Sequence, residues 1–363
     1  MLTPLRRARI LAFVALLTAS LVVAAACASY DAVQFVNGNT GWAAGNSGIM
    51  KTTDGGQTWT KQYGGPAHII GLDFVDEQHG WAVGDNTLLA TTDGGQTWVT
   101  SGEPPQPLLK VAFVNAGVGY GIASASADVP GSVVKTTDGG RTWQTLSTPD
   151  PAGDVCFRSA SEGWAGVITP KGAGDAINGL AVLHTTDGGG TWQRVLSVAP
   201  QDLLSAGGPS FTGNVVAAQL RCTSGAVWFL ALGLPAHQAT RAYRVYRMDN
   251  AGHWALTLAS SNAGAAQAGP PLGPLTFEAP NASTAYVGGV CGACSPTASV
   301  LRTTDAGQHW TQLPAPADPS VSFHASFVSP TEGWLVTHPD NPNHIGLTFH
   351  TADGGQTWQQ QFP

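Results

Sequence analysis

The octapeptide TTDGGQTW occurs twice without change in this chain, at Thr52–Trp59 and at Thr91–Trp98. Near copies follow, and each keeps an Asp five residues before a Trp. Successive aspartates lie 39 to 62 residues apart, which is the length of one four-stranded sheet with variable loops. The seven pairs are Asp54 and Trp59, Asp93 and Trp98, Asp138 and Trp143, Asp187 and Trp192, Asp249 and Trp254, Asp305 and Trp310, and Asp353 and Trp358.

A second mark, Gly-Trp or a near equivalent, precedes each copy of the octapeptide. Short, evenly spaced strands with an aromatic and a Gly mark in each unit are typical of a β-propeller. The sequence therefore predicts an all-β, seven-bladed β-propeller over residues 31–363, with one repeat per blade. Blades one and seven are expected to pack through side chains without sharing a strand. The aromatic residues of the second mark are Trp42, Trp81, Tyr120, Trp164, Trp228, Tyr286 and Trp334.

The chemistry of a turn explains the residues of the octapeptide. An Asp such as Asp93 can accept hydrogen bonds from the following backbone N–H groups and hold a hairpin closed. Gly95 can take a positive φ without steric cost. The Trp is expected to turn inward and fill the wedge between neighbouring blades. Since seven copies cannot share one catalytic centre, we interpret the seven aspartates as structural. Arg247 and Ala251 replace the usual Thr and Gly in blade five, so a looser turn is expected there.

Residues 1–27 have the three parts of an export signal. A basic start is followed by the uncharged apolar run Ile10–Ala26, and small residues lead to Cys27. The last four residues resemble the cleavage box of bacterial lipoproteins, which predicts that Cys27 is lipidated and that the protein works outside the cytoplasm. Simple cleavage after Ala26 or Ala28 and an uncleaved anchor are the alternatives. The basic residues are Arg6, Arg7 and Arg9.

The repeat resembles a known motif. The pattern S/T-x-D-x-G-x-x-W is that of the Asp-box, or bacterial neuraminidase repeat, and we use the name Asp-box for the octapeptide below. The combination of GWAVG with TTDGGQTW looks most like the photosystem II stability/assembly factor family, over about residues 31–363. That resemblance implies a single seven-bladed propeller, extracytoplasmic and in bacteria often lipidated, which acts as a non-enzymatic assembly factor.

Composition excludes two classes of protein. Charged residues form 11% of the chain and hydrophobic ones 43%, so disorder driven by high charge is excluded. Without its first 27 residues the chain has 13 basic residues against 23 acidic ones. A chain this acidic, with no cluster of Lys and Arg, is poorly suited to binding a phosphate backbone. We therefore expect no nucleic-acid partner.

Catalysis is not favoured by the inventory of side chains. A sialidase-like centre requires three convergent Arg, and no three obviously converge in this sequence. A glycoside hydrolase requires two carboxylates about 5–10 Å apart, and all 12 Trp already belong to the two repeat marks. The loop residues Asp128, Asp175 and Asp340 could pair, but such residues are more often turn formers. We predict a protein without enzymatic activity or cofactor, with a glycoside hydrolase or a carbohydrate-binding module as the alternatives.

Four cysteines remain after Cys27, and an even number in an exported chain indicates disulfides. Cys156 and Cys222 fall at nearly the same place in the first strands of blades four and five, so we pair them. We pair Cys291 with Cys294, with a redox or metal site as the alternative for their CGAC motif. His338, Asp340 and His344 match no strong metal spacing, so no metal is expected.

Binding loops usually rise from one side of a rigid scaffold. The connections between the second and third strands lengthen from blade three onward. We predict a partner-binding surface there for an envelope or membrane protein complex, with the propeller itself a monomer anchored to the membrane by its lipid. The five connections are Ser124–Gly131, Pro170–Gly179, Gly233–Ala242, Gly289–Ala298 and Thr337–Gly346.

Overall fold

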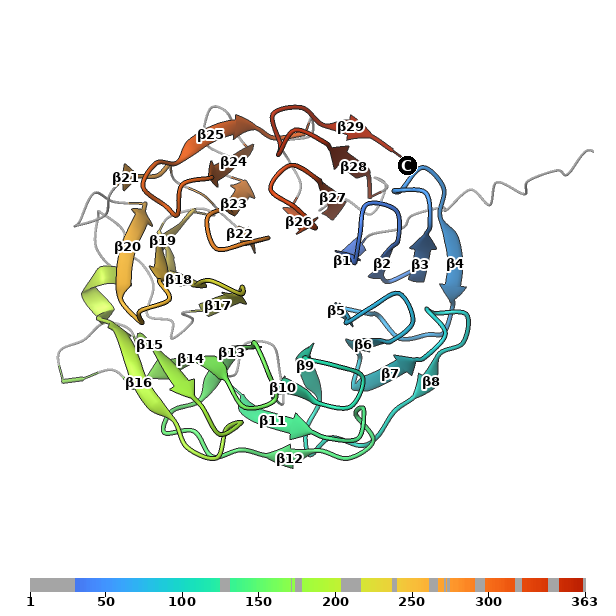
Figure 1. Ribbon diagram of the computed structural model, residues 1–363, viewed down its shortest axis with the longest axis horizontal. Coiled ribbons are helices and arrows are strands. Elements are labelled where there is room, and N and C mark those ends of the chain that lie inside the picture. Colours follow the sequence, from blue (N-terminus) through green and yellow to red (C-terminus); the bar gives the residue numbers. More distant parts are fainter. Residues whose placement is uncertain are drawn as a thin grey trace, which may run out of the picture.

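The computed structural model of the chain shows seven β-sheets arranged as blades around a central axis (Figure 1). It describes residues 30–124, 131–170, 172–173, 178–203, 217–236, 240–260, 267–270, 272, 275–290, 298–316, 322–338 and 346–361. The predicted all-β fold and the number of blades are confirmed. Each blade contains consecutive strands of its own repeat, so the prediction of one repeat per blade is also confirmed.

The first strand of every blade lies next to the axis, and the second lies outside it. The innermost strands are β1 (Tyr30–Phe35), β5 (Gly71–Phe74), β9 (Leu108–Phe113), β13 (Ala152–Phe157), β17 (Ala217–Cys222), β22 (Leu275–Glu278) and β26 (Ser322–Phe327). The second strands are β2 (Gly41–Gly45), β6 (Gly80–Gly84), β10 (Gly119–Ala123), β14 (Gly163–Thr169), β18 (Val227–Ala236), β23 (Ala285–Val290) and β27 (Gly333–His338).

The third and fourth strands complete each blade toward the rim. The third strands are β3 (Gly48–Thr52), β7 (Thr87–Thr91), β11 (Ser132–Thr136), β15 (Gly179–Thr185), β19 (Thr240–Met248), β24 (Ala298–Thr303) and β28 (Thr348–Thr351). The fourth strands are β4 (Thr60–Tyr63), β8 (Val99–Thr100), β12 (Gln144–Thr145), β16 (Gln193–Val198), β20 (Trp254–Ala259), β25 (Thr311–Pro314) and β29 (Gln359–Gln360). A 3-10 helix, η1 (Pro200–Leu203), follows β16.

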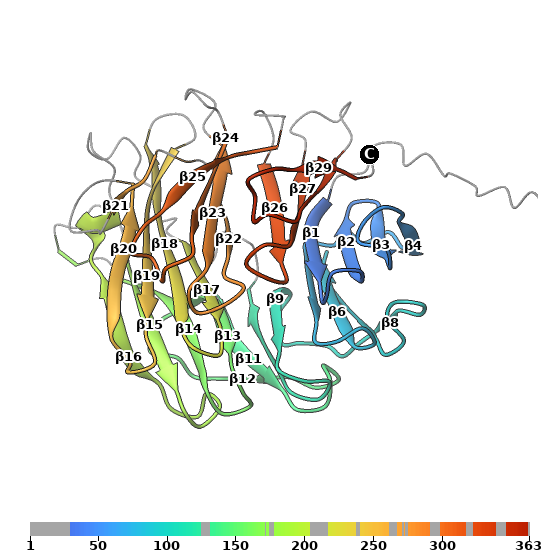
Figure 2. The ribbon, with the colours of Figure 1, turned by 45° about the horizontal axis from the view of Figure 1, so that its top comes forward.

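The four strands that every blade has are antiparallel to their neighbours, and Figure 2 shows the blades side by side around the ring. Blade five also has a fifth strand, β21 (Gln267–Ala268), which pairs parallel with β20. The ring closes between blades seven and one without an exchanged strand, as predicted. Trp334 of blade seven stacks on Phe35 of blade one and donates from Nε1 to the Gly55 carbonyl at 2.8 Å.

The aromatic packing between blades differs from the prediction. We expected the Asp-box Trp to fill the wedge, but the fully buried ring is that of the second mark, as Trp42 is 0% and Trp81 is 3% exposed. Of the Asp-box tryptophans only Trp310 is buried, and the others are half-buried. The difference follows from the strand on which each residue lies. The second mark is on the second strand, between neighbouring blades, whereas the Asp-box Trp lies at the start of the fourth strand, near the rim.

The Asp-box turns have the hydrogen bonds that the sequence predicts. In blade two the Thr97 N–H donates to Asp93 Oδ1 at 2.9 Å, and the Thr97 hydroxyl donates to Asp93 Oδ2 at 2.6 Å. Gly94 and Gly95 both have positive φ. In blade five Arg247 replaces the Thr, and Gly252 is the one residue of this Asp-box turn that has a positive φ. Asp249 there still accepts from the Ala251 and His253 N–H groups, so the turn is altered in shape but remains hydrogen-bonded.

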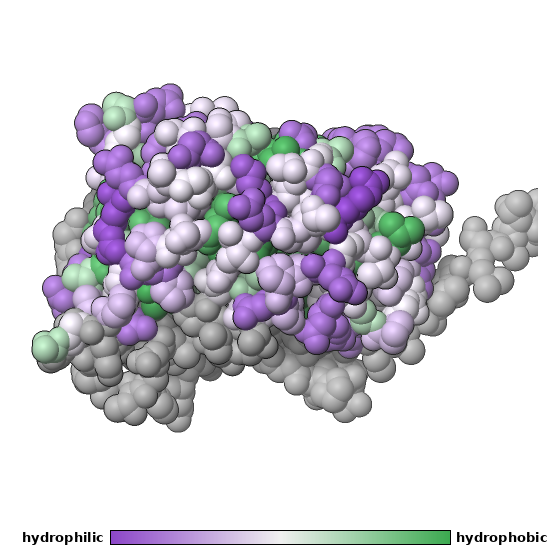
Figure 3. Space-filling view, turned by 90° about the horizontal axis from the view of Figure 1, so that it is seen from below, coloured by the Kyte–Doolittle hydropathy of each residue, from purple (hydrophilic) through white to green (hydrophobic). Residues whose placement is uncertain are grey.

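The described surface has few exposed apolar side chains. The only large hydrophobic residues exposed among the described ones are Ile70 and Val99. Figure 3 shows hydrophobic residues scattered singly among polar and neutral ones on the side in view. Isolated apolar residues of this kind are normal on a soluble surface. No helix among the described residues is long and apolar enough to span a bilayer.

Candidate functional site: the central channel

A cavity of about 620 Å³ follows the axis, and residues from all seven innermost strands line it. One position recurs in its wall, namely the strand residue that pairs with the aromatic residue of the second mark. We call the seven residues at this position the channel residues. They are Gln34, Asp73, Ala112, Cys156, Arg221, Glu278 and Ser326.

Three channel residues bond to the main chain of the next blade. The Gln34 side chain accepts from the Phe74 N–H at 2.7 Å and donates to the Phe74 carbonyl at 3.1 Å. Ser326 Oγ accepts from the Phe35 N–H at 3.0 Å. Asp73 Oδ2 accepts from the Phe113 N–H at 2.5 Å. These contacts fix neighbouring blades to one another at the inner end of three seams.

The Asp73 carboxyl has an unusual proton affinity. Burial raises its pKa to about 7, although the Phe113 N–H and the nearby Lys110 ammonium act in the opposite direction. Burial has this effect because a low-dielectric surrounding penalises the charged form of a carboxyl group. Asp73 therefore changes charge near neutral pH, unlike an exposed aspartate.

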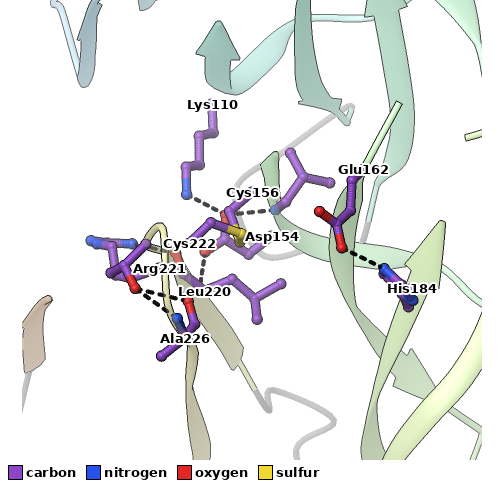
Figure 4. The surroundings of a disulfide bond; sticks show 11 residues. Lys110, Asp154, Cys156, Glu162, His184, Leu220, Arg221, Cys222 and Ala226 are labelled. Carbon is purple, nitrogen blue, oxygen red and sulfur yellow. Dashed lines mark hydrogen bonds and ion pairs between the residues drawn. A yellow bond between two sulfur atoms is a disulfide. The ribbon is translucent and has the colours of Figure 1, made fainter. Parts of the chain in front are cut away.

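Asp154 of β13, next to the lining residue Val155, is the most deeply buried carboxylate among the described residues, at 3% exposure. Its Oδ1 forms an ion pair with Lys110 of blade three and accepts the Val155 N–H at 2.8 Å. Its Oδ2 accepts from the Leu220 N–H of blade five at 2.7 Å. Figure 4 shows Lys110 directed toward Asp154, beside the disulfide. One carboxylate thus connects three blades, and its hydrogen bonds offset the cost of burying the charge.

Arg221 and Glu278 form the corresponding contact between blades five and six. Nη2 of Arg221 lies 2.9 Å from Glu278 Oε1, and Nη1 donates to the Leu220 carbonyl at 2.9 Å. Burial alone would lower the pKa of Arg221, but the Glu278 and Asp154 carboxylates outweigh it and raise the pKa. The signs therefore alternate around the wall from blade two to blade six. We call this series the charge belt: Asp73, Lys110, Asp154, Arg221 and Glu278.

The charge belt is arranged for structure more than for acid–base catalysis. The Asp154 and Glu278 carboxylates are each bound by a cation, whereas a general acid or base has to transfer its proton to a substrate within hydrogen-bond reach. Among the described side chains, no group of three or more His, Cys, Asp or Glu is placed to hold a metal ion. The channel can offer hydrogen bonds and local charge to a partner group.

The predicted site residues that the structure describes lie in two places, the Asp-box turns and the disulfide. The seven Asp-box aspartates stay in their own turns, at the ends of the third strands, away from the channel. Their bonds to the turn lower the pKa of all seven, to about 2 for Asp93, Asp138, Asp187, Asp305 and Asp353. Cys156 and Cys222 form the disulfide that we paired from the sequence, with Cα atoms 5.7 Å apart.

Several predicted residues fall outside the described part of the chain. They are Cys27, Asp128, Asp175, Cys291, Cys294, Asp340 and His344, together with the side chain of His338 and most of the five long connections. The lipidation, the second disulfide and the loop surface therefore stay predictions.

Sequence reasoning missed the charge belt. Its members lie in the innermost strands and are of four different residue types, so no repeated motif marks them. A signal does exist: six of the seven channel residues stand directly before the last position of the first strand, which is Phe in five blades, and the seventh, Glu278, ends its strand. Strand alternation from that Phe identifies the wall of the channel.

The sequence was compared with known families and structures. Residues 66–173 match the family model described as photosynthesis system II assembly factor YCF48. No curated protein matches the chain. A solved structure titled YCF48 bound to D1 peptide is 19% identical, with a TM-score of 0.55, over 91% of this chain and 93% of that one.

Two further solved structures are similar to this chain over most of its length. The extracellular domain of the hybrid two-component system BT4673 from B. thetaiotaomicron has a TM-score of 0.53 at 9% identity, over 90% of this chain and 38% of that one. The GH74 enzyme of Niastella koreensis has a TM-score of 0.39 at 15% identity, over 90% of this chain and 55% of that one. The latter score is too low to carry an argument. The resemblance found in the repeat is thus confirmed: this chain is a seven-bladed propeller whose residues 66–173 match the photosystem II assembly factor YCF48 family.

Proposed function

We propose that the protein is a non-enzymatic binding factor that assists the assembly or stability of a membrane protein complex. The observation that carries this proposal is the family match over residues 66–173, which covers blades two and three and the first half of blade four. A relative of similar size, YCF48, has been solved with a D1 peptide bound. We transfer from it only the general kind of partner, a segment of a membrane protein.

The channel geometry is consistent with binding instead of catalysis. Its cations and most of its carboxylates are paired with one another, which leaves a rigid wall that is close to neutral overall. A rigid scaffold with polar groups suits the recognition of a partner segment, because little conformational entropy is lost on binding.

We further propose that the chain is exported and attached to a membrane through Cys27. The basic start, the apolar run and the small residues before Cys27 support this proposal. The Cys156–Cys222 disulfide also supports it, since disulfides persist mainly outside the reducing cytoplasm. The Cys27→Ala variant should move from the membrane fraction to the soluble extracytoplasmic fraction. Equal retention of both forms would contradict lipid attachment.

The binding proposal is tested by purifying the tagged full-length protein from detergent-solubilised native membranes and quantifying co-purified proteins by mass spectrometry. A membrane protein present in near-stoichiometric amount is expected. A control variant, Gln356→Ala on the exposed rim of blade seven, should still co-purify with the partner. Recovery of the propeller alone, or with glycan only, would contradict the proposal and would favour the glycoside hydrolase or carbohydrate-binding alternative.

A further inference from the structure

The seams between blades are held by a recurring hydrogen bond on the Asp-box side of the ring. At six of the seven seams, the aromatic residue of the second mark donates to a main-chain carbonyl of the next blade. These pairs are Trp42 with Gly94, Trp81 with Gly139, Tyr120 with Ala160, Trp228 with Asn281, Tyr286 with Pro330 and Trp334 with Gly55. Each bond fixes one blade against its neighbour.

The seam between blades four and five lacks this bond in the part of the chain that is described. Trp164, the aromatic residue of blade four, is 1% exposed, and its Nε1 is buried with no hydrogen-bond partner. Arg158 lies over the Trp164 ring at 4.6 Å, and its Nε and Nη2 are also buried without partners. No described carbonyl of blade five accepts a hydrogen bond from Trp164 Nε1 or from these two nitrogens of Arg158.

Two other contacts are replaced at the same seam. In five blades the last residue of the innermost strand is a Phe that stacks on the aromatic ring of the preceding blade, as Phe74 does on Trp42. Blade five has Cys222 at this position. Four blades carry a Lys or Arg that pairs in register with the second-mark aromatic and donates across the seam, as Lys51 does to the Gly94 carbonyl. Blade four has the shorter His184 there, as blade two has Ala90 and blade seven has His350.

The disulfide stands where those contacts are missing. It joins Cys156 of β13 to Cys222 of β17, which are the innermost strands of blades four and five. At three other seams, the channel residue of one blade accepts a hydrogen bond from the backbone N–H of the last residue of the next blade's first strand, which is the position that Cys222 has in blade five. The disulfide is thus the covalent counterpart of that contact. Besides it, this seam keeps the Asp154–Leu220 hydrogen bond and a cluster of buried apolar side chains.

Cys156 and Cys222 both line the central cavity. Cys222 is only partly buried, whereas Cys156 is 8% exposed. A thiol that enters the channel can therefore approach the Cys222 sulfur, and attack at a disulfide sulfur is the way in which thiols reduce disulfides. Lys110 and Arg221 lie close by in the charge belt, and nearby cations favour the thiolate form of a cysteine.

From these contacts we infer that the Cys156–Cys222 disulfide is a redox-sensitive clasp, and that its reduction by a dithiol loosens the inner end of this one seam. In the exchange, a dithiol gives two electrons and two protons to the cysteine pair. The S–S bond becomes two thiols, and the dithiol leaves as its own disulfide. The apolar cluster keeps the two blades together, so the expected change is local opening of β13 and β17 and not global unfolding.

The test is hydrogen–deuterium exchange of the full chain before and after incubation with dithiothreitol under native conditions. Amides of Ala152–Phe157 and Ala217–Cys222 are expected to exchange at least about fivefold faster after reduction, because a smaller local opening energy exposes them more often. Amides of β1 and β5, whose seam has no disulfide, should keep their rates. Unchanged exchange in β13 and β17 after complete reduction, or equal acceleration in all blades, would overturn the inference.

Two variants separate the clasp from other thiols. The double variant Cys156→Ser/Cys222→Ser should already exchange rapidly at β13 and β17 and should not respond to dithiothreitol. The double variant Cys291→Ser/Cys294→Ser should respond as the natural chain does. If the first variant fails to fold, alkylation of the natural chain tests whether the reduced cysteines become accessible. After mild reduction, iodoacetamide should label Cys156 and Cys222 without denaturant, and labelling only in denaturant would overturn the inference.

Discussion

Phe74 of blade two lies face to face on Trp42 of blade one, with ring centroids 3.5 Å apart and planes 8° from parallel. Trp98, the Asp-box residue of blade two, meets the other side of this pair edge-on, at 5.8 Å from Phe74. The same three-ring arrangement recurs at the seams around Phe35, Phe113, Phe157 and Phe327. The aromatic marks of the sequence therefore join blades to one another.

Replacing Trp42 should cost more stability than replacing Trp98. Trp42 is 0% exposed, so Trp42→Ala should lower the free energy of unfolding by about 3–5 kcal/mol, as for other buried aromatics. Trp98 is half-buried, so Trp98→Ala should cost roughly 1–2 kcal/mol. Urea unfolding of both variants checks the order. Equal losses would show that the second-mark ring is not the main contact, and Trp42→Phe controls for loss of the indole N–H.

Ala306→Gly should stabilise the protein. Ala306 occupies the first Gly position of the blade-six Asp-box turn with a φ of 64°, a left-handed conformation that is unfavourable for any residue with a Cβ. Removing the methyl group should raise the free energy of unfolding by about 0.5 kcal/mol after the greater chain entropy of Gly is subtracted. Thermal unfolding measures the shift.

The neighbouring glycine supplies a matched control for that substitution. Gly307 has a φ of 85°, and a Cβ there would lie 2.5 Å from Thr257 Cγ2. Gly307→Ala should therefore lower the melting temperature, whereas Ala306→Gly raises it. A fall in both variants would contradict the strain argument.

Lys110→Met should destabilise the channel wall, because it leaves the Asp154 carboxylate buried without its cation. Loss of one partner of a fully buried pair costs about 3–5 kcal/mol. Lys110 itself is 35% exposed. Because solvent screens the pair, we expect a smaller loss in the free energy of unfolding, roughly 2–3 kcal/mol. Adding Asp154→Asn should recover part of the loss in a double-mutant cycle. Additive losses would show that the two side chains are not coupled.

The pH dependence of stability should reflect two opposing sets of carboxyls. The folded pKa of Asp73 is raised to about 7, so the unfolded chain loses this proton first and stability falls as pH rises from about 4 to 7. The folded pKa of Asp93 and four other Asp-box residues is lowered to about 2. Their contribution is complete above about pH 4 and is lost as pH falls toward 2.

Asp73→Asn separates these two effects. The variant should lose the decline in melting temperature between about pH 4 and 7, because no proton is released there on unfolding, while the fall below about pH 4 should remain. Melting curves at half-unit intervals of pH provide the measurement. A variant that follows the natural chain between pH 4 and 7 would show that another group titrates there.

The sequence predicted the parts of the fold that repeat. Asp93 and Gly95 occur in a motif whose turn depends on local hydrogen bonds, so the turn and the number of blades followed from it. The prediction that the Asp-box Trp, such as Trp98, fills the space between blades was wrong, because sequence spacing does not say which of the two aromatic marks is buried there. Asp73, Lys110 and Asp154 could not be grouped, because only closure of the ring brings innermost strands of different blades together.

The cysteines show what register alone can predict. Cys156 and Cys222 stand near the same place in their two first strands, and neighbouring blades place such positions side by side, so the pairing was correct. The sequence did not indicate that the disulfide replaces non-covalent contacts at its seam. That conclusion required the buried, unpartnered Nε1 of Trp164.

We propose that this propeller assists assembly of a membrane complex without catalysing a reaction. The most direct measurement is pulse-labelling of membrane proteins in cells with and without the gene, followed by native gel electrophoresis of solubilised complexes. We expect one complex to form more slowly without the propeller and an unassembled subunit to accumulate, with recovery when the natural chain is restored. Identical assembly rates for all membrane complexes in the two strains would contradict it.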